Sequence, residues 1–590
     1  MSELLYIDGQ LMDLGENVDI TLNYKSNMLT DLSKIVGNNS YTINLPKTMR
    51  NLSVVGCADV PGSVSSFPRV FHDARYFRNG VEIVKNGKAV LMGIGESIEV
   101  VLAWGGASAL TKIVEDERSL NELEDFTDYV VWSSGISPSA YNGTSEIIFP
   151  DIHLWIDSTK QPVSIHPAAR SSFIFNALNR YYGLSVVFPS ERKAFIDSLI
   201  FPLLTRNGGY ANRVNNQGTW IQNSLSGIDT IVKNGADFDK VFVAEGFNNT
   251  LTNIKVLQDC KVVIRPSFKS IFIGSSLQYG TESVLENTVY LPYEVKTAYG
   301  LTEYVYTEPI EVELTAGDKF RIAGIYPIAT GVNDALFTFG AQPSEIQLGD
   351  KFPIVENLPE IKVVDFIKAI AAMAGLFVVP SADGNTLNFV PFDYVGDRTR
   401  AIDWSDKVVP VSEMNTPKGI SYSLEGFAKN NRLVYLEDDT VATWANGNIV
   451  VGDATLDYER EAIELPFAPS DSWAFGKAEI KLYEYDKDGK PELQEVEPRV
   501  LIEKNEGGVS TGVFDGLHWS TLIANYYQTY QNAVKSPVII TESIRLDELS
   551  LRDLDMSIPV YLRQYGKYFA VVEVNAPSSG ICEVKLLQLE

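Results

Sequence analysis

The stretch LPEIKVVDFIKAIAAMAGLFVV, residues 358–379, constrains the fold more than any other part of the chain. Pro359 is expected near the start of a helix, where its missing N–H is tolerated. Gly375 can adopt the left-handed conformation that ends a helix, and residues 376–379 then predict a buried strand. The apolar residues that predict the buried face of this helix recur at helical spacing: Val363, Phe366, Ile367, Ile370 and Ala374.

A second stretch, HPAARSSFIFNALNRYYGLSVVF from His166, follows the same pattern. In both stretches a proline and a glycine are 16 residues apart, and Gly-Leu-x-Val-Val follows at 183–187 and 375–379. Two interpretations are open, an internal duplication or two separate uses of an ordinary helix–glycine–strand pattern. Neither stretch carries a catalytic motif, which favours a scaffold. The apolar face expected for the earlier helix comprises Ile174, Leu178 and Tyr181.

Length and charge limit the classes of protein that this chain can be. A chain of 590 residues is long enough for roughly three to five domains. Its net charge of −27 is the reverse of what tight binding to nucleic acid requires, because such binding uses cationic residues facing phosphates. An acidic wall that lets DNA slide past without sticking remains compatible with this charge.

Cysteine usage and apolar runs point to a protein made in a cytoplasm. Cys57, Cys260 and Cys582 are odd in number and far apart, which argues against a disulfide framework and a cysteine zinc site. The start, MSELLYIDGQ, lacks a cationic segment followed by a long apolar run, so we expect no signal peptide. The longest apolar stretch, residues 369–379, is too short to span a bilayer, and we expect no membrane span.

The order of helix-like and strand-like patterns along the chain predicts a multidomain α+β fold in which antiparallel β-structure predominates. Aromatic residues make up 11% of the chain and favour strands. Short strands separated by turn residues between 241 and 345 are typical of a sandwich. The predicted segments are a β domain at 1–125, a first helix–strand unit at 126–240, an inserted β-sandwich at 241–345, a second helix–strand unit at 346–400, a β domain at 401–517, and a helix with a closing sheet at 518–590.

Turn and stop signals add local detail to this division. Asn-Gly pairs at 79–80, 86–87 and 446–447 predict hairpin turns. Pro202 is expected to stop a helix that begins near residue 190, and Pro537 to end a helix that begins at His518. The residues expected to form one apolar stripe on that last helix are Trp519, Leu522, Ile523, Tyr526, Tyr530 and Val534.

The sequence offers no constellation that would carry catalysis. His72, His153, His166 and His518 lack the spacing of metal ligands. His166 is expected at a helix start and His518 beside a tryptophan, both in structural roles. Residues 486–489 resemble the opening of a calcium loop, but a polar hairpin turn is expected there. We therefore expect no catalytic residue, no cofactor-binding residue, no metal ligand and no cofactor.

A group of tyrosines in the expected insert allows two interpretations. Aromatic faces on a β-sandwich can stack on sugars or contact a partner. The same residues can instead alternate into the core. The group comprises Tyr290, Tyr293, Tyr299, Tyr304 and Tyr306.

Several stretches, taken in order, resemble tailed-bacteriophage baseplate or tail hub proteins, a class of prophage tail-tip structural protein. The first stretch is SNMLTDLSKIVGNNSYTINLPKTMRN, followed by DFIKAIAAMAGLFVVPSADGNTLNFVPF, by IDWSDKVVP with FAKNNRLVYLEDD, and finally by PVYLRQYGKYFAVVEVN. They occupy 26–51, 365–392, 402–410, 427–439 and 559–575. Residues 241–345 have no counterpart in this resemblance.

The resemblance implies a structural virion protein rather than an enzyme. It implies a homotrimer in which each subunit contributes two β-barrel domains like those of the tail tube. Such a protein joins the tail tube to other tail-tip proteins, lines the DNA channel, and is assembled in the host cytoplasm. One alternative is a tail-tip protein that binds a host glycan through residues 241–345, and a second is a polysaccharide or cell-wall hydrolase.

Overall fold

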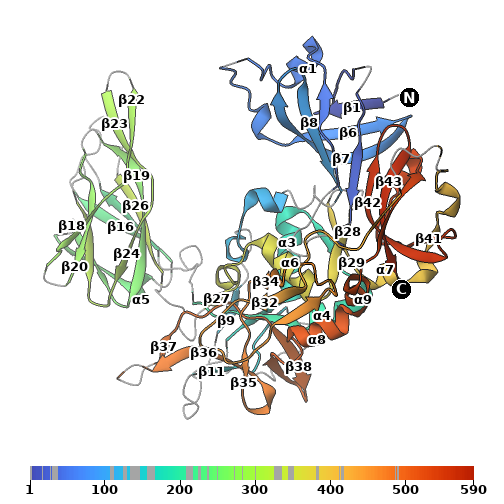
Figure 1. The fold of residues 1–590 in the computed structure, drawn as a ribbon. Helices are drawn as coiled ribbons and strands as arrows, with labels where there is room; N and C mark the ends of the chain where they lie inside the picture. The colour runs from blue at the N-terminus through green and yellow to red at the C-terminus, as the bar shows by residue number, and fades with distance from the viewer. Residues whose placement is uncertain are drawn as a thin grey trace. The chain divides into compact units, whose positions relative to one another are not determined.

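The computed structural model divides the chain into two compact units, of which the second is inserted into the first. Unit 1 comprises Met1–Phe126, Ser137–Leu204 and Leu358–Glu590, and unit 2 comprises Thr127–Ile136 and Thr205–Asn357. Figure 1 shows the strands of unit 2 mostly in green. The described residues are 3–15, 18–26, 28–29, 38–60, 62–105, 112–123, 129–132, 146–155, 166–206, 217–222, 228–235, 238–248, 250–270, 273–281, 284–298, 301–323, 335–342, 351–379, 385–410, 412, 418–485, 487 and 491–589.

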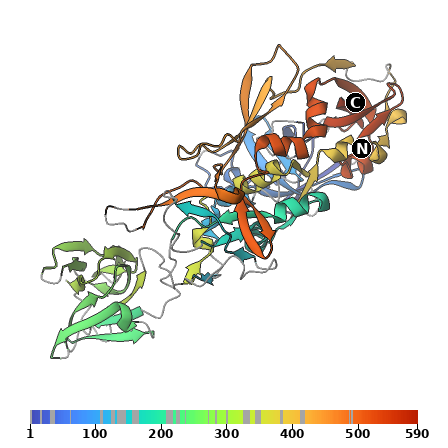
Figure 2. The same ribbon diagram turned by 90° about the horizontal axis from the view of Figure 1, so that it is seen from below.

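Both ends of the chain share one 14-stranded sheet in unit 1, and the chain ends marked in Figure 2 both belong to this unit. Its order is β2-β1-β6-β7-β8-β4-β3-β42-β43-β40-β31, with β5 paired to β8, β41 to β42 and β30 to β41. The described order is open, ending at β2 and β31. The strands are β1 Glu3–Ile7, β2 Gln10–Leu11, β3 Leu22–Lys25, β4 Asn38–Ser40, β5 Ile43–Leu45, β6 His72–Arg78, β7 Val81–Ile94, β8 Ile98–Trp104, β30 Ile402–Asp403, β31 Gly419–Ser421, β40 Ile539–Arg545, β41 Val560–Leu562, β42 Lys567–Ala576 and β43 Ile581–Leu589.

The join between the two chain ends is the antiparallel pair of β3 and β42. Leu22 lies opposite Ala576, and Lys25 lies opposite Glu573. The expected β domain at 1–125 and the closing sheet at 518–590 therefore share one continuous sheet. One hydrophobic core includes residues from both, among them Leu5 and Leu586. Burial of this shared apolar surface favours keeping the two ends together.

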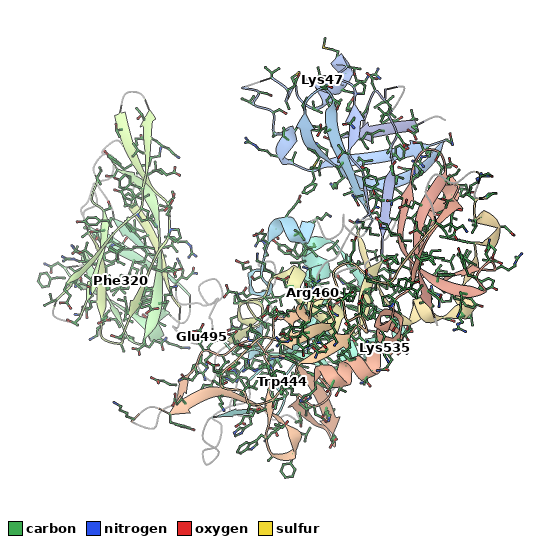
Figure 3. The ribbon with its side chains drawn as sticks, in the orientation of Figure 1. Lys47, Phe320, Trp444, Arg460, Glu495 and Lys535 are labelled. Carbon is green, nitrogen blue, oxygen red and sulfur yellow. The ribbon has the colours of Figure 1, made fainter. Side chains whose placement is uncertain are left out.

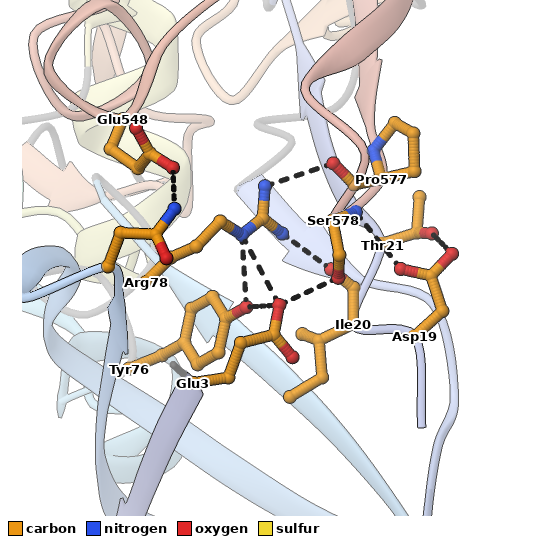
Figure 4. Close-up of polar contacts among 10 residues, drawn as sticks. Glu3, Asp19, Ile20, Thr21, Tyr76, Arg78, Glu548, Pro577 and Ser578 are labelled. Atoms are coloured by element: carbon orange, nitrogen blue, oxygen red, sulfur yellow. Dashed lines mark hydrogen bonds and ion pairs between the residues drawn. The ribbon is translucent and has the colours of Figure 1, made fainter. Parts of the chain in front are cut away.

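A buried arginine reinforces the join (Figure 4). Arg78, at the end of β6, donates from Nη1 to the carbonyl oxygen of Pro577 at 3.0 Å and from Nη2 to that of Ile20 at 2.8 Å. Its Nε donates to the Tyr76 hydroxyl at 3.1 Å and lies 3.5 Å from Glu3 Oε1. One guanidinium thus links the first strands to the residues that follow β42.

The two predicted helix–glycine–strand stretches both form. α3 (Ser171–Tyr182) ends at Gly183 with φ +65° and is followed by β13 (Ser185–Val187). α6 (Val363–Met373) is followed by Gly375 with φ +63° and β28 (Leu376–Val379). The apolar face predicted for α6 is buried throughout, whereas Tyr181 on α3 is half-buried. α6 begins at Val363, later than the start expected near Pro359.

The two stretches meet in one three-stranded sheet. β29 (Thr386–Pro391) lies between them, parallel to β13 and antiparallel to β28. The rings of Phe175 on α3 and Phe366 on α6 are 5.6 Å apart. Arg192, on α4 (Ser190–Asp197), donates to the carbonyl oxygen of Ala374 at 3.1 Å and pairs with Asp393 at 2.7 Å. The two stretches therefore belong to one packed region of unit 1.

Three further sheets complete unit 1. Their orders are β10-β12-β14-β38-β39, β11-β36-β35 with β37 paired to β36, and β33-β32-β34. Most strand pairs in the described part of the chain are antiparallel, as the sequence predicts. The strands are β10 Ile147–Ile148, β11 His153–Trp155, β12 Ala168–Arg170, β14 Leu199–Pro202, β32 Asn430–Tyr435, β33 Gly447–Val450, β34 Glu459–Leu465, β35 Asp471–Ser472, β36 Ala478–Tyr485, β37 Pro491–Leu493, β38 Leu501–Glu506 and β39 Val509–Val513.

Short helices connect these sheets. The remaining α-helices of unit 1 are α1 Met49–Val54, α7 Asp393–Gly396, α8 Trp519–Tyr526, α9 Gln528–Lys535 and α10 Glu548–Arg552. The 3-10 helices of unit 1 are η1 Phe67–Arg69, η2 Leu120–Glu122, η6 Arg398–Arg400, η7 Ser405–Lys407 and η9 Ala474–Gly476. Residues 112–116 are also helical.

The two larger sheets of unit 2 share one core, which is the arrangement of a sandwich. The orders are β16-β15-β26-β19-β23-β22 with β24 paired to β19, and β17-β18-β25-β20-β21. Phe339 of the first sheet lies 5.4 Å from Phe320 of the second, and Figure 3 shows Phe320 among these strands. The insert expected at 241–345 lies within unit 2, which extends beyond it on both sides.

The elements of unit 2 have the following bounds. They are β9 Tyr129–Val131, β15 Gln217–Gln222, β16 Asp229–Asn234, α5 Phe238–Val241, β17 Phe242–Phe247, β18 Thr250–Val256, β19 Cys260–Ser270, β20 Ser276–Gly280, β21 Asn287–Tyr290, β22 Glu294–Ala298, β23 Leu301–Tyr306, β24 Ile310–Leu314, β25 Lys319–Ala323, β26 Ala335–Gln342, β27 Lys351–Pro353 and η5 Val355–Asn357. β9 and β27 pair with each other.

One of the three predicted Asn-Gly hairpin turns is correct. Asn79 and Gly80 both have positive φ and connect β6 to β7. Asn86 also has positive φ, but it lies inside β7, where the register with β6 shifts, so it forms a bulge rather than a turn. Gly447 begins β33, and the Asn446 side chain accepts a hydrogen bond from the backbone N–H of Tyr435.

The predictions for two helices need correction. The helix after His518 is broken at Tyr527, where φ is −119°, and it continues as α9. The break turns Tyr527 inward in place of the predicted Tyr526, which is half-buried. α4 ends at Asp197, before Pro202, which instead closes strand β14. His166 precedes strand β12 rather than starting a helix.

The two helix-ending glycines provide a matched pair of substitutions. A Cβ at Gly375 would lie 2.7 Å from the carbonyl oxygen of Tyr526, whereas a Cβ at Gly183 meets nothing within 4 Å. Gly183→Ala should cost about 1–2 kcal/mol, since only the left-handed conformation is penalised. Gly375→Ala should cost at least about 1 kcal/mol more, because the backbone of Tyr526 must also shift. Urea unfolding measures both, and equal losses would contradict the close approach at Gly375.

The role of Arg78 is tested against Arg75 on the same strand. Arg78→Leu leaves two carbonyl oxygens and the Glu3 carboxylate without their buried donor, so we expect a loss of about 3–5 kcal/mol. Arg75 forms an exposed ion pair with Glu82, and Arg75→Leu should change the unfolding free energy little. Thermal unfolding compares the two variants. Similar stability of both would show that Arg78 does not hold the chain ends together.

Candidate functional site

A cavity of about 710 Å³ lies between α6 and β34 in unit 1. We call it the α6–β34 groove. One wall comes from the helix that the sequence singles out, and the opposite wall comes from β34 and the residues that follow it. The lining residues are Glu360, Ile361, Lys362, Asp365, Lys368, Ala369, Ala372, Leu436, Glu461, Ala462, Ile463, Glu464, Leu465, Pro466, Glu497 and Pro498.

The helical wall results from the two-sided pattern of α6. One side of the helix is buried in the core, while Asp365, Lys368, Ala369 and Ala372 recur at helical spacing on the side that lines the groove. The two alanines have short side chains, which leave space close to the helix backbone. The groove therefore combines a small apolar floor with charged residues nearby.

Carboxylates outnumber cations along the groove. Its lining includes Glu360, Asp365, Glu461, Glu464 and Glu497. Lys368 lies 3.7 Å from Asp365, and Lys362 lies 3.6 Å from Glu117. Both lining lysines thus have acidic partners already, and the groove carries a net negative charge.

A buried ion pair lies directly behind the wall formed by Glu497 and Pro498. The guanidinium of Arg499 is fully buried, pairs with Asp438, and donates to the carbonyl oxygen of Glu497 at 2.6 Å. The Asp438 carboxylate is 7% exposed and also accepts two hydrogen bonds from Thr440. Burial opposes ionisation, but these bonds and Arg499 hold the pKa of Asp438 below its ordinary value. Burial lowers the pKa of Arg499.

The four histidines lie apart from this groove. His72 bonds Asp8 at 2.6 Å and the carbonyl oxygen of Phe67 at 2.9 Å. His166 bonds the carbonyl oxygen of Leu203 at 3.0 Å and the hydroxyl of Tyr483. His518 precedes α8 and its ring lies 5.2 Å from that of Phe514. These contacts are structural ones within unit 1.

His153 occupies a more polar setting. Its ring stacks on Trp473 at 4.1 Å, and its Nε2 lies 3.8 Å from Glu479 Oε1. Burial, with Lys477 nearby, lowers the pKa of His153 although Asp151 opposes this. Burial raises the pKa of Glu479. The 3.8 Å separation exceeds hydrogen-bonding distance, so no donor–acceptor pair is formed here.

The tyrosines of the insert divide between core and surface. Tyr306 is buried and stacks on Phe268 at 4.6 Å, while Tyr304 is half-buried. Tyr290 and Tyr293 are exposed. Tyr299 lies outside the described residues, as do Asp486, Asp488 and Gly489 of the expected polar turn. Part of the group therefore packs into the core, and for the exposed part the binding interpretation stays a prediction.

Within the described ranges, no group of three or more His, Cys, Asp or Glu side chains is arranged to hold a metal ion. The same residues include no helix with the length and apolar character needed to cross a bilayer. The groove was not predicted from the sequence, because its charges come from segments as far apart as residues 360 and 497. The only local signal of the groove in the sequence was the stripe of small and charged side chains on the side of α6 that lines it.

Comparison with known proteins leaves the family open. No protein-family model matches the chain, and no curated protein matches it. The solved structure of the 43 kDa tail protein of prophage MuSo2 from Shewanella oneidensis aligns with 100% of this chain and 98% of its own, at 7% identity and a TM-score of 0.33. GITRL from bushbaby aligns with 21% of this chain and 94% of its own, at 11% identity and a TM-score of 0.14. Neither TM-score establishes a shared fold.

Substitution of two aspartates that have equivalent contacts with a threonine tests the ion pair behind the groove. Asp438 and Asp453 each accept from the N–H and hydroxyl of the threonine two residues on, at the same 2.8 and 2.6 Å. Only Asp438 also pairs with buried Arg499. Asp438→Asn should therefore cost about 3 kcal/mol at neutral pH, because it leaves a buried charge uncompensated. Asp453→Asn should cost much less.

The same pair predicts a pH dependence. The folded-state pKa of Asp438 is below its ordinary value of 3.8, so its contribution is present above that pH and is lost as the pH falls through the folded-state pKa. The difference in unfolding free energy between wild type and Asp438→Asn should therefore shrink below pH 3.8. Urea unfolding at several pH values measures it. A difference that grows on acidification would contradict the assignment.

Proposed function

We propose that this chain is a structural component of a phage tail, the hub or baseplate protein that joins the tail tube to the tail tip and lines the DNA channel. The observation that carries the proposal is the location of the hub-like stretches. All of them, 26–51, 365–392, 402–410, 427–439 and 559–575, fall in unit 1. The segment without a counterpart, 241–345, falls in unit 2.

Contacts among these stretches give the mapping further support. β4 and β5 of the first stretch belong to the same sheet as β41 and β42 of the last, although most of the chain separates them in sequence. β30, from the stretch at 402–410, pairs with β41. Three of the five hub-like stretches thus contribute to one sheet, while 365–392 and 427–439 contribute β28, β29 and β32 to two other sheets of unit 1.

The chain's charge suits a DNA channel. With a net charge of −27, surfaces that face the lumen would repel phosphates and let DNA pass without binding. We propose a homotrimer that contacts the tail tube and other tail-tip proteins in the virion tail, after assembly in the host cytoplasm. We also propose that tube-like barrels close in that trimer. The proposed role involves no catalysis.

A second candidate function is binding of a host glycan through unit 2. The observation that favours it is a set of exposed aromatic side chains on this unit, because aromatic faces stack on sugars. Phe247 is 77% exposed and Tyr290 is 70% exposed. The remaining alternative, a polysaccharide or cell-wall hydrolase, predicts release of sugar or peptide by the purified chain.

The oligomeric state tests the structural role. The purified full chain should behave as a trimer by light scattering, because the proposed hub closes a ring around the channel. Duplex DNA should not co-elute with it at physiological salt, since the chain is strongly acidic. A monomer at all concentrations, or retention of DNA, would remove the proposal.

A polysaccharide array probed with the full chain distinguishes the second candidate. Glycan binding that is lost in Phe247→Ala with Tyr290→Ala would support a receptor-binding role. Tyr306→Phe serves as the control, because its ring is buried in the core and its stacking on Phe268 is preserved. Absence of binding on the array would remove this candidate.

A further inference from the structure

The α6–β34 groove has an edge strand as one of its walls. Among the described strands, β34 pairs with β32 and with no other. Its opposite edge lies along the seven residues from Glu459 to Leu465, most of which line the groove. Exposed strand edges present backbone N–H and C=O groups that can pair with another extended chain.

Residues just beyond β34 show which edge is open. The carbonyl oxygen of Phe467 accepts from Leu436, which continues the β32 side. The N–H of Ala468, in the same peptide unit, donates to the carbonyl oxygen of Pro498 at 2.8 Å. The C=O and N–H of one peptide point in opposite directions across a strand, so Pro498 lies along the outer edge.

Within the described residues, the chain therefore covers this outer edge only where β34 has ended. Ala468 forms an isolated parallel bridge with Arg499, and buried Arg499 is held by Asp438. This contact demonstrates that the edge accepts an extended segment. On the N-terminal side of this contact, the outer edge of β34 faces the cavity, and no other described strand pairs with it.

The charge of the groove determines the kind of segment that fits it. Glu461 and Glu464 lie on β34, with Glu360, Asp365 and Glu497 around them. The lining lysines already lie beside acidic partners. An entering segment with lysine or arginine side chains would meet carboxylates that outnumber the lining lysines, and backbone pairing would supply the remaining interactions.

We propose that the α6–β34 groove binds an extended, basic segment of a partner protein, which adds as a strand to the outer edge of β34. A second copy of this chain is a poorer occupant, because the chain has 76 acidic and only 49 basic residues. Backbone pairing with the edge gives affinity, and the carboxylates select for cationic side chains. This inference does not rest on the tail-hub proposal.

Peptide binding to the full chain tests this inference. The probe is a short fluorescent peptide that alternates lysine and valine. Two comparison peptides replace the lysines with glutamate or introduce prolines that cannot form a strand ladder. Fluorescence anisotropy should show binding of the lysine peptide alone, weakened by salt. Hydrogen exchange should show new protection at residues 459–465.

Charge reversal on the strand provides the decisive variant. Glu461→Lys with Glu464→Lys should weaken binding at least about fivefold, because two favourable charge pairs become repulsive. The control, Glu96→Lys with Glu506→Lys, changes net charge equally at exposed positions outside the groove lining and should bind as wild type. If the reversed variant misfolds by circular dichroism, Ala372→Leu narrows the groove instead and should also weaken binding.

Several outcomes would overturn the inference. These are equal binding of the lysine and glutamate peptides, tight binding of the proline peptide, equal loss in the control variant, or protection confined to segments other than 459–465. Absence of binding by any peptide would also overturn it. Self-association that the lysine peptide does not displace would assign the groove to a second copy of the chain.

Discussion

The pairing of β13 with β29 is the contact on which the arrangement of unit 1 depends. It joins Val186 to Leu387 across residues 205–357, the longer segment of unit 2, and β28 then pairs on the other side of β29. Such a contact closes a very long loop, but the entropic penalty grows only slowly with loop length. Residues 205–357 therefore have to bring the chain back to the sheet that it left after β13. The pairing of β13 with β29 places no other requirement on their sequence.

The same arrangement places α6 at the centre of both structure and proposed binding. Its apolar side packs against α3 and the core, Arg192 donates to the carbonyl oxygen of Ala374 at the end of the helix, and the backbone of Tyr526 lies close to Gly375. Its other side forms a wall of the acidic groove. One helix thus links the stability of unit 1 to the surface that we propose receives a partner.

Local features of this fold were largely predictable from the sequence, whereas distant pairings were not. The glycines at 183 and 375 end their helices as expected, because left-handed backbone is tolerated best by glycine. Asn86 adopts the positive φ that its pattern favours, yet the neighbouring strands continue and produce a bulge. Tyr527 replaces Tyr526 in the core because the helix breaks there. The join of β3 to β42 and the groove arise from residues far apart in sequence, whose meeting no local pattern encodes.

We propose that unit 1 is the scaffold of a ring-forming tail hub. The symmetry of the assembled protein is the property that tests this proposal most directly. A closed ring requires the same surface to meet its complement in each subunit. Two-dimensional class averages from electron microscopy of the purified full chain measure this symmetry most directly. The account predicts threefold averages with a central channel. Single particles without a ring, or rings of another symmetry that lack a channel, would contradict it.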